Sequence, residues 1–321
     1  MRNKLDSVAL EARKEHWKKI LIGSNEKRGL LLSIFMYVLL TSIAFIFLYP
    51  VLYMLSTSLM PREDLLDSAA KWIPSSIYLK NYYDAILTMD YWNTLFKNFI
   101  IAFFPMLAQV LICSMVGYGL ARFEIPGKVF WMILVLLTFL LPPQVTMIPN
   151  YVLYSKLKLT GTLWAFILPA LLGMGFKSAL FILIFYNFHR QVPHSLVEAC
   201  EIDGASPMGA YFKIAVPLSI PAIVVVILFS FVWYWNETTL TQMYLGYASS
   251  SDGLTTLLLE LQKFEDSYES VYNPWEASPN KLNDAIRMAG TMLSIAPLLI
   301  MYLVLQKRFV ESVDKTGITG E

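Results

Sequence analysis

A polar stretch, HSLVEACEIDGASPMGAYFKIAVPLSIP at residues 194–221, lies between two long apolar segments. Ser195 and Glu198 have the S-x-x-E spacing of a capping box, in which each side chain bonds the other's backbone N–H. This spacing predicts a short helix over about residues 196–203. Gly204 follows, and glycine suits the left-handed backbone position that commonly ends a helix. The first half of the stretch therefore predicts one short helix and a sharp turn.

A second helix is predicted directly after that turn. Ser206 is a favourable N-cap, and Pro207 fits the first helical position because its missing N–H would have no partner there. The helix is expected to continue through Tyr211 and Phe212 toward the next apolar segment. Residues 195–213 therefore form a compact helical projection, for which docking to another protein and an ordinary turn between helices are the two open interpretations.

The composition of the chain indicates a membrane protein. Of the 321 residues, 56% are hydrophobic and only 15% are charged, whereas soluble domains usually contain about 25% charged residues. The net charge of +1 gives no indication of a nucleic-acid partner. Cys113 lies in an apolar run and Cys200 in the polar stretch, so neither a disulfide nor a metal site is expected.

Several apolar runs are long enough for a helix to cross a bilayer, which takes roughly 20 residues. They are residues 29–61, 98–121, 129–155, 159–187, 214–236 and 288–306. The fold class predicted is an all-α membrane protein with six transmembrane helices, forming one domain over residues 29–306.

Prolines within these runs, or at their ends, are expected to kink the helices, because proline removes a backbone donor. They are Pro105, Pro142, Pro143, Pro149 and Pro169.

Basic residues near the spans predict the orientation, since Lys and Arg concentrate in cytoplasmic segments. They are frequent in residues 1–28, in the turn containing Arg122 and Lys128, and in the tail, residues 307–321. Both termini and the polar stretch are therefore expected in the cytoplasm. Residues 1–28 read equally well as a helix lying on the membrane or as a solvated basic leader.

The segment EACEIDGASPMGAYFKIAVP resembles the EAA motif of the permease subunits of ABC importers. That pattern is E-A-A, three residues, Gly, nine residues, Ile, one residue, Leu and Pro. Cys200 stands in place of the second Ala and Val216 in place of Leu, and both changes are conservative. By this resemblance the residues that contact the ATPase are Glu198, Ala199, Cys200, Asp203, Gly204, Ile214 and Pro217.

The resemblance extends over most of the chain. WIPSSIYLKNYYDAI, WNETTLTQMYL and SIAPLLIMYLVLQKRFVESVDKTGITG are similar to the outer loop, the end of the fifth span and the last span and tail of sugar-importing permeases. The second permease subunit of maltose-type and oligosaccharide importers is the most similar class. These proteins often carry a lysine before the last glycine, where this chain has Thr319, so contact between the tail and the ATPase is left open.

This resemblance implies a multi-pass subunit of a bacterial cell membrane that moves a carbohydrate inward by alternating access. The implied partners are a second permease chain, a cytoplasmic ATPase dimer that binds ATP and Mg, and an external solute-binding protein. The chain itself is expected to bind no cofactor or metal and to be no enzyme. In agreement with this, it contains no G-x-x-x-x-G-K-[ST] phosphate-binding loop.

One charge lies within the fourth apolar run. A lysine at membrane depth is costly and usually faces a partner or a cavity, so Lys177 could pair with Glu237 or line the sugar path with Trp233, Trp235 and Asn236. A lysine in the path would suit an acidic sugar. The alternative is an interfacial glutamate and a lysine that faces a neighbouring helix.

Other classes of function receive less support from the residues. A membrane enzyme would need a catalytic or metal cluster, but His16, His189 and His194 form no H-E-x-x-H pattern. A secondary transporter usually shows an internal repeat, and this sequence has none that is recognisable. An ABC importer of a different solute is the remaining alternative.

Overall fold

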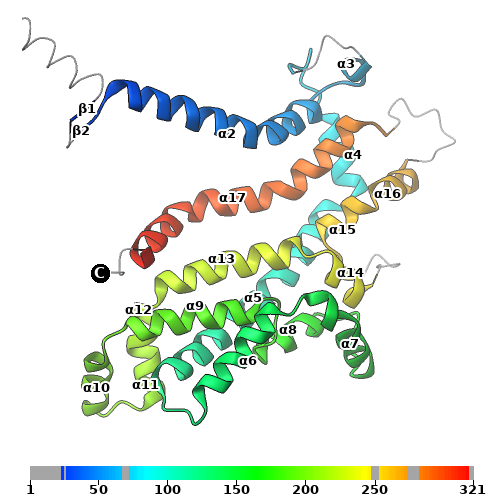
Figure 1. The fold of residues 1–321 in the computed structure, drawn as a ribbon. Helices are drawn as coiled ribbons and strands as arrows, with labels where there is room; N and C mark the ends of the chain where they lie inside the picture. The colour runs from blue at the N-terminus through cyan, green and yellow to red at the C-terminus, as the bar shows by residue number, and fades with distance from the viewer. Residues whose placement is uncertain (1–22, 25–26, 67–71, 247–252, 273–281, 318–321) are drawn as a thin grey trace, which may run out of the picture. The chain divides into compact units, whose positions relative to one another are not determined.

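The computed structural model describes residues 23–24, 27–66, 72–246, 253–272 and 282–317. These residues are largely helical, apart from two-residue strands β1 (Gly23–Ser24) and β2 (Lys27–Arg28), which pair antiparallel (Figure 1). The interpretations of residues 1–28 as a helix or a leader fall mostly outside the described residues. The chain divides into two compact units, Met1–Tyr78 and Leu79–Glu321.

The first unit contains the long apolar helix α2 (Leu30–Ser58) and the short helix α3 (Arg62–Leu66). The carboxylate of Asp64 accepts hydrogen bonds from the backbone N–H and the hydroxyl of Ser75, at 2.7 and 2.8 Å. These bonds fasten α3 to the chain that follows it. The ring of Trp72 packs edge-on against Tyr49 of α2, at 4.9 Å between centroids.

The second unit is built around α5 (Tyr91–Arg122), against which α8, α9 and α13 pack. Its other elements, in chain order, are α4 (Lys80–Thr88), α6 (Lys128–Leu140), α7 (Pro143–Lys156), α8 (Trp164–Leu171), α9 (Ser178–Gln191), α10 (His194–Ile202), α11 (Pro207–Ala210), the π-helical turn η1 (Tyr211–Ala215), α12 (Val216–Leu218), α13 (Ile220–Asn236), α14 (Thr239–Leu245), α15 (Leu257–Gln262), α16 (Phe264–Val271) and α17 (Asp284–Gly317).

Three of the described helices are long and apolar enough to cross a membrane, namely α2, α5 and the part of α17 up to Lys307. Two bent pairs also pass this test. The pair α6 and α7 is bent by 96°, and the pair formed by Pro207–Leu218 and α13 is bent by 77°. Pro142 and Pro143 lie at the first bend, as the kink prediction requires. The last helix continues beyond residue 306 to Gly317, so the predicted tail begins as helix.

The fourth apolar run, residues 159–187, is not the single helix that was predicted. It forms α8 and α9, each shorter than a membrane span, with an irregular connection between them. Gly173 and Lys177 in this connection both have positive φ, +73° and +58°. These left-handed positions interrupt the helix, so the prediction of one continuous span over this run is corrected.

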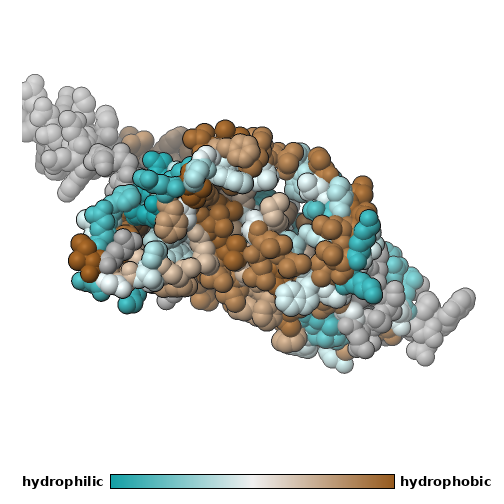
Figure 2. Space-filling view, turned by 90° about the horizontal axis from the view of Figure 1, so that it is seen from below, coloured by the Kyte–Doolittle hydropathy of each residue, from teal (hydrophilic) through white to brown (hydrophobic). Residues whose placement is uncertain are grey.

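Much of the surface is apolar, as expected of a protein solvated by lipid. Figure 2 shows a face on which hydrophobic residues dominate. Helix α6 illustrates the cause, since it has no buried residue and exposes Phe130, Trp131 and Leu140, among others. Apolar surface of this extent is unusual for soluble monomers and indicates contact with a membrane or with other proteins.

Helices α5 and α9 approach closely at Gly117. A Cβ added there would lie 2.6 Å from the Cβ of Phe185 and 2.9 Å from the backbone nitrogen of Tyr186, both in α9. Neither atom belongs to the end of a flexible side chain, so a larger residue would push the helices apart.

We therefore expect Gly117→Ala to destabilise the protein by about 1–3 kcal/mol, the usual effect of overpacking. Gly119→Ala is the matched control on the same helix, because its nearest new contact is 3.8 Å away and alanine favours a helix by about 0.5–1 kcal/mol over glycine. Thermal unfolding in detergent measures both variants. Equal stability of the two would contradict the close packing of α5 against α9.

Candidate functional site

The predicted helix, glycine turn and second helix are all present in residues 194–210. Helix α10 ends in a Schellman motif, in which Gly204 adopts a φ of +84° and the N–H of Ala205 bonds the carbonyl of Cys200 at 3.1 Å. Ser206 caps α11, since its hydroxyl accepts the N–H of Gly209 at 3.1 Å. We call this segment, α10 with α11, the helical projection (Figure 1).

The capping box predicted at the start of α10 is not formed. The helix begins at His194, so Ser195 lies within the first turn and not at the N-cap. Within the described residues, no hydrogen bond joins the hydroxyl of Ser195 to the backbone of Glu198. Glu198 is exposed to solvent, and its carboxylate is therefore accessible to a partner.

The helical projection combines apolar and acidic groups on its surface. Ile202 is 86% exposed and Met208 is 51% exposed, close to the exposed Glu198 and Asp203. Large apolar side chains in water at a sharp turn are typical of a protein-docking surface. The exposed members of the predicted contact set on this projection are Glu198, Ala199, Asp203 and Gly204.

The remaining residues predicted to contact the ATPase, Cys200, Ile214 and Pro217, are less exposed or lie outside the projection. Cys200 is only half-buried on α10. Ile214 lies in the π-helical turn η1 and Pro217 in α12, so both belong to the segment that leads from the projection into α13. A π-helical turn is rare and often occurs at functional sites.

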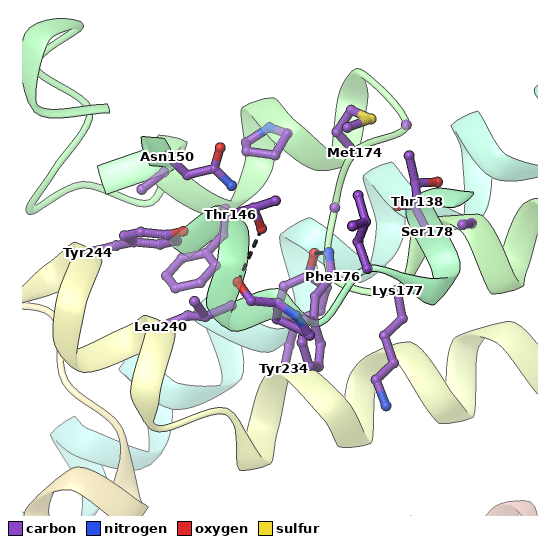
Figure 3. A pocket seen from close by; sticks show the side chains of 18 of the residues that line it. Thr138, Thr146, Asn150, Met174, Phe176, Lys177, Ser178, Tyr234, Leu240 and Tyr244 are labelled. Atoms are coloured by element: carbon purple, nitrogen blue, oxygen red, sulfur yellow. Dashed lines mark hydrogen bonds between the residues drawn. The ribbon is translucent and has the colours of Figure 1, made fainter. Parts of the chain in front are cut away.

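A cavity of about 500 Å³ is lined by residues of α6, α7, α8, α13 and α14, among others. Of these helices, α7, α8 and α14 lie at the end of the bundle away from the helical projection (Figure 1). Figure 3 shows the side chains that converge on the cavity. The residues that line it include Thr146, Asn150, Tyr154, Phe166, Phe176, Lys177, Tyr234 and Tyr244.

One wall of the cavity is polar, because α7 presents Thr146, Asn150 and Tyr154 to it at intervals of four residues. Residues four apart lie on the same helix face. These residues were not predicted from the sequence, although their spacing within the apolar run is a signal of a polar helix face.

Aromatic rings line the cavity beside this polar face. The ring of Tyr244 packs against Tyr154 at 5.1 Å and against Phe166 at 5.7 Å between centroids. Tyr244 belongs to α14, outside the helices that are long and apolar enough to cross a membrane, and burial raises the pKa of its phenol to about 12, with Tyr154 adding to the effect. The phenol is therefore neutral at ordinary pH and supplies a hydrogen-bond donor without a charge.

Lys177 lies at the edge of this cavity, at the start of α9 and not in the middle of a span helix. Its side chain extends away from Thr146 and Asn150 (Figure 3). The ammonium lies 4.3 Å from the centroid of the Trp233 ring and 5.6 Å from that of Phe176. Such cation–aromatic contacts stabilise a partly desolvated charge.

The conceivable pair between Lys177 and Glu237 is not formed. Among the described residues the ion pair found is that of Arg287 with Glu265, while Glu237 accepts the backbone N–H of Leu240 at 2.8 Å. The carboxylate of Glu237 thus accepts a hydrogen bond from the first turn of α14 and does not neutralise the lysine.

The other residues predicted for the sugar path are separated. Trp233 is half-buried and contacts Lys177, and Asn236 is exposed. Trp235 is 2% exposed and packs on Phe231 at 5.5 Å, inside the protein core. Only Lys177 of the predicted path residues lines the cavity.

The described part of the chain contains no group of three or more His, Cys, Asp and Glu side chains that could hold a metal ion.

The family of binding-protein-dependent transport system inner membrane components matches residues 20–315. The chain belongs to this family. It is therefore a multi-pass protein of the bacterial inner membrane and a permease component, not an enzyme. Members of the family work with a separate ATPase and with a solute-binding protein, which agrees with the exposed helical projection.

Several relatives have similar length. The chain is 27% identical to the polygalacturonan/rhamnogalacturonan transport system permease protein YtcP of Bacillus subtilis, over 90% of this chain and 99% of the relative. It is also 27% identical to the arabinooligosaccharides transport system permease protein AraQ of Halalkalibacterium halodurans, over 87% of this chain and 93% of the relative.

A solved structure has the same fold. It is a chain of a bacterial ABC transporter involved in the import of the acidic polysaccharide alginate, with a TM-score of 0.68, and it shares 21% sequence identity. The match covers 87% of this chain and 96% of the other.

The turn in the helical projection provides a test of its rigidity. We expect Gly204→Ala to destabilise α10 by about 1–2 kcal/mol, the penalty for a side chain in the left-handed region. No atom lies within 4 Å of the added Cβ, so the backbone conformation alone causes this effect. Hydrogen exchange of residues 194–206 should accelerate roughly fivefold or more, since 1.4 kcal/mol corresponds to a factor of ten. Gly209→Ala, within α11, is the control. Unchanged exchange in the Gly204 variant would argue against the Schellman turn.

Proposed function

We propose that this chain is the permease subunit of an ABC importer that moves an oligosaccharide into the cell by alternating access. The observation that carries the proposal is the cavity in which the polar face of α7 lies beside aromatic rings. The relatives named for polygalacturonan and arabinooligosaccharide transport support a carbohydrate substrate.

The cavity has the chemistry that a saccharide requires. The faces of sugar rings are apolar and pack on aromatic side chains, such as those of Phe166 and Tyr244. Sugar hydroxyls need donors and acceptors, which Thr146, Asn150 and the neutral phenol of Tyr244 provide. Ligand sites typically combine mostly apolar walls with a few convergent polar groups in this way.

The helical projection is the proposed contact with the ATPase. In this proposal, a cytoplasmic ATPase dimer binds ATP and Mg, closes, and moves the projection of each permease chain. Glu198, Ala199, Cys200, Asp203 and Gly204 form the contact. Ile214 and Pro217 connect the projection to α13. Nucleotide binding thereby shifts the population between inward-open and outward-open states. The second permease is a different chain, and an external binding protein delivers the sugar.

Lys177 favours an acidic saccharide within this class. Lys177 is exposed and lies at the edge of the cavity, and its ammonium, which extends away from Thr146 and Asn150, lies on the ring of Trp233. A cation within a membrane-spanning region usually faces a partner or a water-filled pathway. A carboxylate on the substrate would supply the opposite charge.

Co-purification tests the permease assignment. A complex containing this chain should include an ATPase, and its ATP hydrolysis in proteoliposomes should rise when sugar-loaded binding protein is added. Transport by this chain alone, without any ATPase, would refute the proposal.

A second test separates docking from folding at Glu198. Because Glu198 forms no capping box, Glu198→Gln and Glu198→Ala should both leave the fold intact and both weaken association with the ATPase, by about tenfold. Glu269→Gln, which changes an exposed carboxylate of α16, is the control. Normal association of the alanine variant would exclude Glu198 from the contact.

The third test addresses substrate charge. We expect Lys177→Gln to lower uptake of trigalacturonate about tenfold relative to arabinotriose, each supplied with a binding protein that accepts it. Lys156→Gln, an exposed lysine at the end of α7, should change neither rate. Equal uptake of trigalacturonate by wild type and the Lys177 variant would remove the acidic assignment and leave the carbohydrate proposal standing.

A further inference from the structure

Gln109 is a wholly buried amide in the middle of α5 that connects three elements. Its Nε2 donates to the carbonyl of Phe176 at 2.7 Å and to the hydroxyl of Ser178 at 2.8 Å. Its Oε1 accepts the hydroxyl of Ser230, in α13, at 2.6 Å. Both amide donors and the amide oxygen are therefore engaged, as a buried polar group requires.

These bonds hold the connection between α8 and α9 at the edge of the cavity. The broken helix frees backbone groups that must find partners within the protein at membrane depth. Gln109 bonds the carbonyl of Phe176, and the N–H of Phe176 donates to the hydroxyl of Tyr234 at 3.1 Å. The backbone that places Lys177 is thus fixed on both sides by side chains from α5 and α13.

The other end of the same helix holds the helical projection. The guanidinium of Arg122 donates to the carbonyl of Val192, directly before α10. The hydroxyl of Tyr211, directly after α11, donates to the hydroxyl of Ser114 at 3.0 Å. Helix α5 therefore contacts the chain on both sides of the projection.

An aromatic cluster reinforces these two hydrogen bonds. The ring of Tyr118 in α5 packs against His189 at 5.4 Å and against Tyr211 at 5.1 Å between centroids. His189 itself is wholly buried. The base of the projection is thereby packed on α5 and is not held by flexible surface contacts.

The two ends are joined by uninterrupted helix. Gln109 and Arg122 are separated by about 20 Å at 1.5 Å per residue, and the proline of α5, Pro105, lies outside this interval. Gly117 lies between them, where α9 packs too closely to slide freely. A displacement of the projection is therefore transmitted along α5 as the movement of a rigid body.

We propose that Gln109 is a positioning residue that couples the cavity to the helical projection. When the projection moves, α5 moves with it, and the bonds of Gln109 displace the connection that carries Phe176 and Lys177. The inference rests on the proposed function. It adds a specific route by which the state of the ATPase reaches the sugar.

The test uses the assembled complex in proteoliposomes, with trigalacturonate and arabinotriose as probes. Gln109→Leu retains the approximate volume of the side chain and removes all three bonds. We expect sugar moved per ATP hydrolysed to fall about tenfold, while loaded binding protein still stimulates hydrolysis. Thr94→Val is the control. The hydroxyl of this buried threonine of α5 donates to a carbonyl close in sequence, that of Met89 at 2.9 Å.

A milder variant keeps the test decisive if Gln109→Leu fails to assemble. Ser230→Ala removes one bond and leaves both amide donors of Gln109 in place, and should lower the same ratio about threefold. A purely structural role would reduce the yield of complex without changing the ratio. An unchanged ratio in an assembled Gln109 or Ser230 variant would therefore overturn the proposal.

Accessibility of the connection gives an independent measurement. Lys177→Cys is labelled with a maleimide with and without ATP, and the labelling of the parent chain, in which Cys113 is fully buried and Cys200 half-buried, is subtracted. The labelling rate should depend on nucleotide in this protein and lose that dependence when Gln109→Leu is added. Persistence of the dependence would overturn the inference. Absence of stimulation by binding protein in the wild type would instead refute the proposed function.

Discussion

The central constraint in this protein is that a backbone broken at membrane depth must be hydrogen-bonded by other parts of the protein. The connection between α8 and α9 meets it through the amide of Gln109 and the phenol of Tyr234. Both groups come from helices that contact the core of the bundle. The irregular backbone can therefore present Lys177 and Phe176 at the edge of a cavity without leaving polar groups of Phe176 unpaired.

Apolar periodicity and turn chemistry predicted much of the architecture. Gly204 and Ser206 were recognised because only a few residue types fit a left-handed turn and an N-cap, and Pro142 and Pro143 marked a true bend. The break at Lys177 was missed because a run of apolar residues reads as one helix when its length suits a bilayer. Gly173 was the local signal, because it ends α8 with a φ of +73° in a turn closed by the N–H of Met174 and the carbonyl of Pro169 at 2.8 Å.

The site was predicted less completely than the fold. The projection follows from local spacing, since its turns are made by residues close in sequence. The cavity depends on α7, α8, α13 and α14 meeting in space, which no local pattern specifies. Trp235 shows the limit of reasoning from residue type. It belongs to the segment WNETTLTQMYL, which resembles sugar-importing permeases, and it was expected to line the sugar path. The structure places it in the core instead.

The π-helical turn η1 has a consequence for how the projection is aimed. Each residue of an α-helix turns the chain by about 100°, and a π-helical turn accommodates one extra residue without breaking the helix. A relative that lacks or gains one residue in Tyr211–Ala215 would present its projection in a different direction while its cavity stayed the same. Length variation at this turn would therefore change the direction of the projection, the proposed ATPase contact, without altering the cavity.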